Sequence, residues 1–431
     1  MSAKAEPLWD LVEESLDESA FLWRRWEAEL RSLTRNLDEI WSWTEDRLQG
    51  ALDGVRVSGD RMPHALESAL AGDDPAPLSV AAHLLAARSI PEARSALAAA
   101  VGAATGARLS SMLRGVEVAE LDGTFAPVTA VLSGKSPEHA AALCRLKGFR
   151  RAAPARELAL AFESNVPELQ AQALHAARYA PDETFVRCAS AGLKSDSPAV
   201  RRAALETGLY RRWPNAWELA LQLTRERNPE AAPLLPLLAA LGSTEEQQLV
   251  VSSLRVPSLQ PSGLFALGFI GTPEAVDVCI AGMRDPKLAR MAGEAYCAIT
   301  GAGLARDALA AAEPDEAQSP PPIEADPLDA DLVPTPQDSW PLPNVDAVRE
   351  HWAGVRSRYA SGVRHLGGRP ISLDVLIAAI ESGPMVRRPG LILEAAIRTA
   401  GRYDVEPRAF AHVQRRMMAA GRGAVAQPGT G

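Results

Sequence analysis

The sequence contains little of what marks export, membrane insertion or a disulfide framework. Only four of its 431 residues are cysteines, and no two of them form a Cys-x-x-Cys pair. They are widely spaced, each within an apolar helical pattern, at Cys144, Cys188, Cys279 and Cys297. No apolar run reaches about 18 residues, and the first residues lack the charged and then apolar layout of a signal peptide. We therefore expect reduced core thiols and a cytoplasmic protein that does not enter a membrane.

The sequence also lacks the motifs of known catalytic and cofactor sites. The seven histidines never form a close pair, and neither His-Glu-x-x-His nor Gly-x-Ser-x-Gly occurs. Gly134-Lys135-Ser136 matches the end of a phosphate-binding loop, but Thr129 stands where that loop requires a glycine. Gly301-Ala302-Gly303 lacks the rest of a dinucleotide fingerprint. We therefore predict a protein without catalytic residues, metal or cofactor, and not an enzyme.

Lysine is scarce: only five of the 45 basic residues are lysines. The net charge of the chain is −9. The densest basic cluster therefore consists of arginines: Arg201, Arg202, Arg211, Arg212, Arg225 and Arg227. One interpretation gives them structural ion pairs, such as Arg201 with Asp196, and ordinary solvated faces. The other makes them a groove for an acidic partner, protein or nucleic acid. The negative net charge and the lack of interleaved aromatic residues weigh against nucleic acid.

A helical unit is clearest between Leu264 and Gly301. Thr272-Pro273-Glu274 has the residue types of a helix start, and the apolar residues that follow recur at helical spacing. Asp285-Pro286 is predicted to start a second helix, which Gly301 stops. Each helix is apolar on a face that its own pair cannot cover, so the unit needs neighbours and indicates a repeat.

Prolines report the period of this repeat. Pro137, Pro167, Pro198, Pro229 and Pro261 follow one another at intervals of 30, 31, 31 and 32 residues. Two helices in a period near 30 residues are typical of an α-solenoid. Strand signals are nearly absent, and the stretch 116–121, which alternates weakly, is interpreted as a connection. We therefore predict an all-α fold, with the solenoid over residues 60–306.

The N-terminal segment, residues 1–59, differs from the solenoid in being rich in tryptophan. Five of the nine tryptophans fall within it, along three amphipathic helical patterns. Large aromatic residues at helical spacing belong to a core or to a helical cap of the solenoid in one interpretation. In the other they form an exposed partner-binding stripe, with Trp23 and Trp26 as the candidates.

The C-terminal third divides into three further segments. Residues 307–344 are predicted to be an extended acidic linker, since residues 307–346 hold ten acids, nine prolines and no base. Residues 345–420 form a small helical module that is rich in arginine, with Arg387 and Arg388 as a second candidate binding site. The opposite charges of linker and module suggest that they touch each other. Residues 421–431 are predicted to be a disordered tail.

Several stretches resemble a known family. Leu267–Val276 is similar to a bacterial HEAT repeat. More specifically, the chain resembles a family of HEAT-repeat proteins found mainly in type VI secretion gene clusters of proteobacteria and myxobacteria. The similarity lies in Asp17–Trp23 with Arg47–Gly59, in Ala289–Gly301, and in Gly362–Pro370 with Leu376, Gly383 and Arg388. It extends over residues 6–420 and implies a HEAT-like α-solenoid with a helical N-terminal cap and a small helical C-terminal module.

The repeats and the resemblance together predict a non-enzymatic protein–protein interaction scaffold. By resemblance, its partner is a component or cargo of a type VI secretion system, with an adaptor or chaperone-like role. One alternative is a HEAT-like nucleic-acid-binding or base-excision-type enzyme that uses an arginine-lined concave groove. A further alternative is a toxin-binding, immunity-like protein. The sequence does not distinguish an adaptor from an immunity protein.

Overall fold

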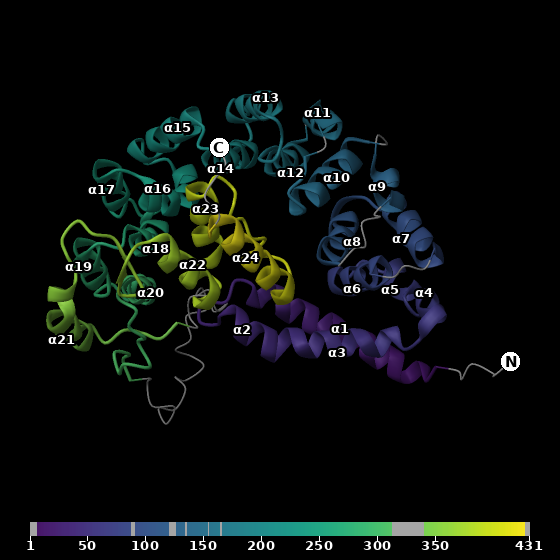
Figure 1. Cartoon of the computed structure of the whole chain (residues 1–431), viewed down its shortest axis with the longest axis horizontal. Helices are drawn as coiled ribbons and strands as arrows, with labels where there is room; N and C mark the ends of the chain where they lie inside the picture. Colours follow the sequence, from purple (N-terminus) through teal and green to yellow (C-terminus); the bar gives the residue numbers. More distant parts are fainter. Residues whose placement is uncertain are drawn as a thin grey trace, which may run out of the picture. The chain divides into compact units, whose positions relative to one another are not determined.

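The protein is all-α, as predicted, and its helices pack in sequential pairs of the α-solenoid type (Figure 1). A computed structural model describes residues 7–87, 91–119, 126–133, 136–153, 155–163, 166–312 and 340–426. The chain forms two compact units, residues 1–219 with 396–431 and residues 220–395. The segment boundaries predicted above follow composition and sequence pattern rather than contacts, and they stay a prediction. Each unit is described by itself below.

The first unit contains a two-layered stack of helices. One layer consists of α6 (Pro75–Ala86), α8 (Gly106–Val118), α10 (Pro137–Phe149), α12 (Pro167–Ala177) and α14 (Pro198–Tyr210), each packed on the next. The second layer consists of α7 (Pro91–Ala103), α9 (Ala126–Leu132), α11 (Ala155–Glu163) and α13 (Asp182–Leu193). The second-layer helices pack against their neighbours in the first layer, which produces the helical pairs (Figure 1).

Sequence signals for helix starts and close packing explain this stack. Ser136 caps α10, because its Oγ accepts a hydrogen bond from the His139 backbone N–H at 3.2 Å. Ala140, Ala173 and Ala204 are fully buried in one core cluster that spans α10 to α14. Small side chains let the helix backbones approach closely, so the frequent alanines set the spacing of the layer.

The N-terminal part of the first unit consists of longer and shorter helices. They are α1 (Trp9–Glu29), α2 (Leu37–Ile40), the π-helix η1 (Trp41–Glu45), α3 (Asp46–Arg56), the 3-10 helix η2 (Gly59–Arg61), α4 (Met62–Ala65) and α5 (Glu67–Ala71). Helix α1 packs on α3 and α6, and α24 (Ala411–Ala426) packs on α2 and η1. Helix α24 therefore packs with N-terminal helices in one unit.

Helix α24 corrects one prediction. Residues 421–426 continue this helix, so the prediction of a disordered tail from Gly421 was wrong for them. Gly421 is buried, and a Cβ added there would lie 2.7 Å from the Tyr403 ring. This close contact with the ring holds the last turns of the helix on the core. Residues 427–431 lie outside the described residues.

The second unit repeats the stacking on a smaller scale. Helices α16 (Leu235–Leu241), α18 (Gln260–Ile270) and α20 (Ala289–Thr300) form one layer, and α17 (Thr244–Ser253) and α19 (Pro273–Gly282) pack beside them. The remaining elements are η3 (Pro229–Leu234), α21 (Val345–Val355), η6 (Arg356–Arg358), β1 (His365–Leu366), β2 (Arg369–Pro370) and α22 (Leu373–Ser382). Helix α15 (Pro214–Arg225) continues from the first unit into the second, and α23 (Arg388–Arg398) leads back.

Two local predictions in the repeats were wrong, and one predicted helix start has a different helix type. Helix α20 begins at Ala289 rather than at Asp285-Pro286, because the Asp285 carboxylate accepts from the Lys287 N–H at 3.0 Å and holds a turn. Pro229 begins a 3-10 helix, which contains a second proline, Pro233. The stretch 116–121 is not a plain connection, since α8 continues to Val118.

The predicted linker falls largely on residues 313–339, which lie outside the described residues. Its two ends are paired: the Ala311 N–H donates to the Leu342 carbonyl at 2.7 Å, and the Asn344 N–H donates to the Leu309 carbonyl at 2.8 Å. The short β1–β2 hairpin is the strand pair that the sequence did not indicate. In the part of the chain that is described, no helix has the length and apolar character needed to cross a membrane.

Candidate functional site

Trp23 and Trp26 are core residues, which decides between the two interpretations of the N-terminal tryptophans. Both are almost fully buried, and their rings pack edge to face with centroids 5.3 Å apart. The Trp26 Nε1–H donates to the buried Glu45 carboxylate at 2.7 Å. The alternative of an exposed binding stripe built on them was therefore wrong. Trp43 is the exposed tryptophan of this segment, with Arg35 over its ring.

Three of the six arginines of the cluster make local structural contacts. Arg201 donates to the Ser195 carbonyl at 2.7 Å, and the exposed Arg202 pairs with Glu206 at 2.8 Å. Arg211 donates to the carbonyls of Arg178 and Ala180, at 3.1 and 2.9 Å, and pairs with Asp182.

The rest of the cluster is exposed. Arg212 follows α14 with a φ of 53°, and Arg225 and Arg227 lie in the second unit. In the first unit, Arg201 and Arg211 thus serve as caps of backbone carbonyls rather than as the lining of an acidic partner's groove.

Arg387 and Arg388 are not at the surface, so their prediction as a binding site was wrong. The Arg387 guanidinium makes two hydrogen bonds of 2.5 Å to the Glu294 carboxylate and lies over Phe265. Arg388 is fully buried and donates to the Ile380 carbonyl at 2.6 Å. Both side chains hold the second unit together, because a buried guanidinium requires partners for its N–H groups.

An open groove of about 660 Å³ in the first unit lies across the N-terminal halves of α8, α10 and α12. We call it the α8–α12 groove. It is lined by Gly106, Ala107, Leu109, Ser110, Leu113, Ser136, Pro137, Glu138, Ala142, Arg145, Val166, Glu168, Leu169 and Gln172. Most of this lining is aliphatic, and Val166 is 42% exposed at its rim. Such a surface suits an apolar side chain of a partner.

The charged groups of the groove lie at its edges. Glu168 is exposed in the first turn of α12, and Glu138 accepts a hydrogen bond from the Gly106 N–H at the start of α8. Both carboxylates stand near helix N-termini, where the helix dipole stabilises negative charge. Arg145 closes the other side but is engaged by Ser110 and Glu117. The open edge is therefore acidic.

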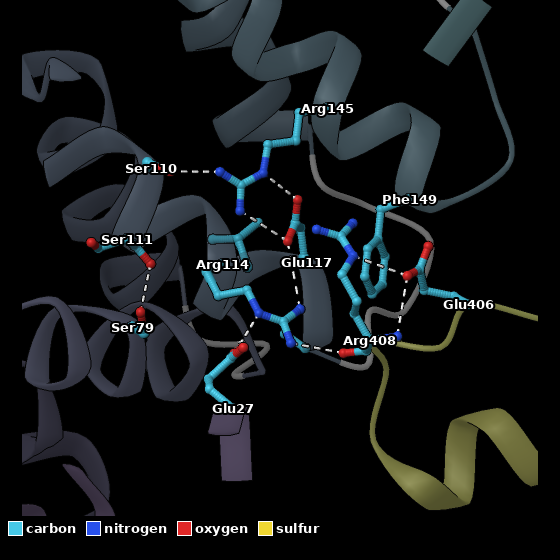
Figure 2. Close-up of polar contacts among 12 residues, drawn as sticks. Glu27, Ser79, Ser110, Ser111, Arg114, Glu117, Arg145, Phe149, Glu406 and Arg408 are labelled. Carbon is cyan, nitrogen blue, oxygen red and sulfur yellow. Dashed lines mark hydrogen bonds and ion pairs between the residues drawn. The ribbon is translucent and has the colours of Figure 1, made fainter. Parts of the chain in front are cut away.

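A buried charge cluster lies behind the groove and centres on Glu117 (Figure 2). Arg145 donates to both Glu117 oxygens, at 2.6 and 3.2 Å, and to the Ser110 hydroxyl. Arg114 lies 3.6 Å from Glu117 and donates to Glu27 on α1 at 2.5 Å. Helices α1, α8 and α10 are thereby tied to one carboxylate.

The charge state of Glu117 follows from these neighbours. Burial opposes its ionisation, but Arg145, Arg408 and Arg114 outweigh burial and lower the pKa of Glu117. Glu406 and Glu117 likewise raise the pKa of Arg408 despite its desolvation. The cluster therefore stays charged at neutral pH. Both Glu117 oxygens accept hydrogen bonds from Arg145, so Glu117 acts as a clamp rather than as a free acid or base.

Other reactive residue types are placed in structural roles. Burial raises the pKa of the Cys144 and Cys297 thiols to about 12, which keeps both protonated. Ser136 Oγ lies 2.7 Å from His139 Nδ1, but the same hydroxyl caps α10. Among the residues described by the structure, no group of three or more His, Cys, Asp and Glu residues is placed to hold a metal ion.

Glu117 and the groove were missed by the sequence analysis. Glu117 lies in the stretch that we interpreted as a connection, between Val116 and Val118. A single acid among valines at the end of a helical pattern was the available signal, because an isolated buried carboxylate needs a cationic partner. The groove has no local signal, since its walls come from three helices that are separated by about 30 residues in sequence.

The fold and these surfaces define the protein as an all-α helical-repeat protein of the α-solenoid class. No family model and no curated protein matches the chain. Among solved structures, the chain is similar to a crystal structure of an engineered protein, with 14% identity, a TM-score of 0.27, and coverage of 97% of this chain and 99% of that chain. At this TM-score the likeness carries no argument, and the resemblance to the secretion-associated family stays a prediction.

Proposed function

We propose that the protein is a non-enzymatic protein–protein interaction scaffold and that a partner docks in the α8–α12 groove. The observation that carries this proposal is an aliphatic groove with an acidic edge, formed jointly by three repeats of the helical stack. A partner segment suited to it has an apolar anchor and a nearby basic residue. Apolar burial supplies affinity, and the acidic edge selects the partner's charge.

The scaffold is proposed to be an accessory, adaptor or chaperone-like protein of a bacterial type VI secretion system. This finer assignment is supported by the similarity of Asp17–Trp23, Arg47–Gly59 and Ala289–Gly301 to that family. The partner is then a component or cargo of the secretion machine, bound in the cytoplasm.

Crosslinking mass spectrometry in the native host tests the proposal, because it names the partner and the contacting helices together. We expect crosslinks from α8, α10 or α12 to a secretion component. Recovery of no such component, with an adequate yield of crosslinks within the chain, contradicts the secretion role. A cognate toxin as the tightly bound partner supports the immunity-like alternative instead.

A pair of matched variants tests the groove itself. Val166 and Val186 are both 42% exposed, but only Val166 lines the groove. Val166→Arg brings a charged and bulky side chain to the apolar rim, and we expect it to weaken partner binding about tenfold or more. Val186→Arg, on α13, is the control and leaves binding unchanged. Equal binding by the two variants removes the groove from the proposal.

The nucleic-acid alternative depends on a strip of arginines that is free to bind phosphates. Arg201 and Arg211 are instead bonded to backbone carbonyls, and Arg202 is paired with Glu206. A gel shift on duplex DNA at low salt is the check, and a salt-sensitive shift revives that alternative.

A further inference from the structure

A segment from the C-terminal part of the chain runs along the helical stack of the first unit. We call residues 402–410 the C-terminal segment. It has no regular secondary structure, and it precedes α24. Its even-numbered residues from 404 to 410 each contact the stack, while Val405 and Ala409 between them are buried. The Ala409 N–H donates to the Glu406 carbonyl at 3.2 Å, so residues 406–409 form a turn within the segment.

Asp404 meets the ends of α12 and α14. Its carboxylate accepts hydrogen bonds from the hydroxyls of Tyr179 and Tyr210, both at 3.0 Å, and pairs with Arg151 at 3.3 Å. Burial, together with the Asp404 charge, raises the pKa of Tyr179 to about 12, so this tyrosine remains a donor. Two repeats thus contribute one hydroxyl each to the same carboxylate.

Glu406 and Arg408 meet the next two helices. Glu406 lies 3.6 Å from Arg151, which follows α10, and Arg408 lies over the Phe149 ring at 5.3 Å. The Arg408 carbonyl accepts a hydrogen bond from Arg114 of α8 at 2.8 Å (Figure 2). The stack therefore contacts the backbone of the segment as well as its side chains.

Phe410 and the start of α24 complete the path. The Phe410 ring packs on Trp26 with centroids 4.5 Å apart and also contacts Trp23 and His83 of α6. The Ala411 N–H donates to the buried Glu45 carboxylate at 2.8 Å. The segment thus crosses α14, α12, α10, α8 and α6 in the reverse of their chain order.

We propose that this face of the stack is a peptide-recognition surface, which the chain's own C-terminal segment occupies in the free protein. The partner that fits it is a segment with an acidic residue followed six positions later by an aromatic one, with a turn between the two like that at residues 406–409. The reason is chemical: without an occupant, the hydroxyls of Tyr179 and Tyr210 lose their shared acceptor, and Trp23 and Trp26 lose the Phe410 ring. Arg114 and Arg151 each lose one of their partners. Only a segment of the same chemistry restores both kinds of contact.

Tethering determines when such a partner binds. The chain's own segment is covalently linked, so its effective concentration near the surface is on the order of millimolar. A free peptide therefore competes poorly with the wild-type segment and binds well once that segment is weakened. This inference concerns other residues than the α8–α12 groove and stands or falls separately from the proposed function.

The direct test uses a fluorescent peptide of residues 402–412 and the full-length variant Asp404→Ala/Phe410→Ala. Both changes remove contacts of the tethered segment and leave the receiving surface intact. We expect saturable binding to this variant, about tenfold or more tighter than to the wild type and than the binding of a peptide with the same two changes. If the variant unfolds cooperatively but does not bind the peptide, the proposal is overturned.

A milder variant keeps the test valid if the double variant does not fold. Asp404→Asn retains the shape of the side chain and removes its charge. We expect amide exchange of residues 403–411 to become about tenfold faster, with the core of α12 unchanged. Asp182→Asn, which removes a similar but exposed partner of Arg211, is the control. Unchanged exchange in the segment, or faster exchange throughout the unit, overturns the proposal.

Discussion

Arginine carries most of the positive charge of this protein, and several arginines form buried ion pairs. Arg387 with Glu294, Arg364 with Glu394, and Arg145 with Glu117 each share two hydrogen bonds between a guanidinium and a carboxylate. The planar guanidinium matches a carboxylate in this geometry, which an ammonium group does not. Such burial explains why the adjacent Arg387 and Arg388 do not form the binding surface that the sequence predicted.

Glu117 offers the sharpest test of such a pair. Glu117→Gln removes the charge while Arg145 and Arg114 remain largely buried, so we expect the free energy of unfolding to fall by about 3 kcal/mol. Urea denaturation followed by circular dichroism measures the change. Glu206→Gln breaks the more exposed pair with Arg202 and is the control, with an expected loss below about 1 kcal/mol. Equal losses contradict a clamp at Glu117.

His83 gives the protein a specific dependence on acid. Burial and the nearby Arg56 lower the pKa of His83 from 6.5 to about 3, and its Nδ1 is a buried atom without a hydrogen-bond partner. The unfolded chain binds a proton below pH 6.5 and the folded protein does not. The contribution of neutral His83 is therefore complete above pH 6.5 and is lost as the pH falls from 6.5 towards about 3.

We expect His83→Gln to flatten the pH profile of stability over this range, by at most about 1.4 kcal/mol per pH unit. Unfolding free energies measured from pH 7 down to the acid limit of folding provide the comparison. His64→Gln changes an exposed histidine and should leave the slope as in the wild type. A His83 variant with an unchanged slope contradicts a neutral, buried imidazole.

At the scale of the helices, the contact between α6 and α8 depends on one glycine. A Cβ at Gly115 would lie 2.0 Å from the Ser79 carbonyl oxygen, so the two backbones cross where no side chain fits. The Ser79 hydroxyl also donates to the Ser111 carbonyl at 2.8 Å, which fixes the register of the two helices. The contrast within the same protein is Gly50 of α3, whose Cβ position faces open space.

Two alanine substitutions should therefore have opposite signs. Gly115→Ala forces α6 and α8 apart, and we expect it to lower the free energy of unfolding by about 3 kcal/mol. Gly50→Ala adds helix propensity without a clash and should raise it by about 0.5 to 1 kcal/mol. Denaturation of the two variants in parallel measures both. Tolerance of alanine at position 115 contradicts the close crossing.

Arginines also explain how one repeat is joined to the next. Arg150, after α10, donates to the Ala119 carbonyl after α8, and Arg211, after α14, donates to the Ala180 carbonyl after α12. The donor and acceptor are 31 residues apart in both cases, close to the proline period. The sequence revealed that period through its prolines, because a proline at the first position of a helix marks the helix start within its own repeat. The partner of each arginine was not predictable, because it lies one repeat away.

The limits of the sequence analysis are clearest for the whole molecule. Residues 396–431 share a compact unit with residues 1–219, a grouping that the sequence did not indicate. The contact of Arg114 with the Arg408 carbonyl joins residues 294 positions apart, and that of Glu45 with the Ala411 N–H spans 366. Helical periodicity reports only neighbours within a few turns. The all-α repeat fold was therefore predictable, and the packing of α24 on the N-terminal helices was not.

The packing of the C-terminal residues in the first unit predicts a selective effect of truncation. A chain that ends at Arg402 lacks α24 and most of the C-terminal segment, and Trp26, Glu45 and Arg114 lose partners that lie in the first unit. We expect amide exchange in α1, α2 and α6 to become about tenfold faster, because their shared core is opened. Residues 220–395 retain α16 to α22, so their protection should not change. Hydrogen exchange mass spectrometry of the truncated and full-length chains resolves the two units.

The full-length variant Arg415→Ala breaks the exposed pair with Asp38 and is the control, since it should leave exchange in both units nearly unchanged. Loss of protection in residues 220–395 as large as in α1 and α6 would show that the C-terminal residues support the whole chain rather than the unit in which they are packed.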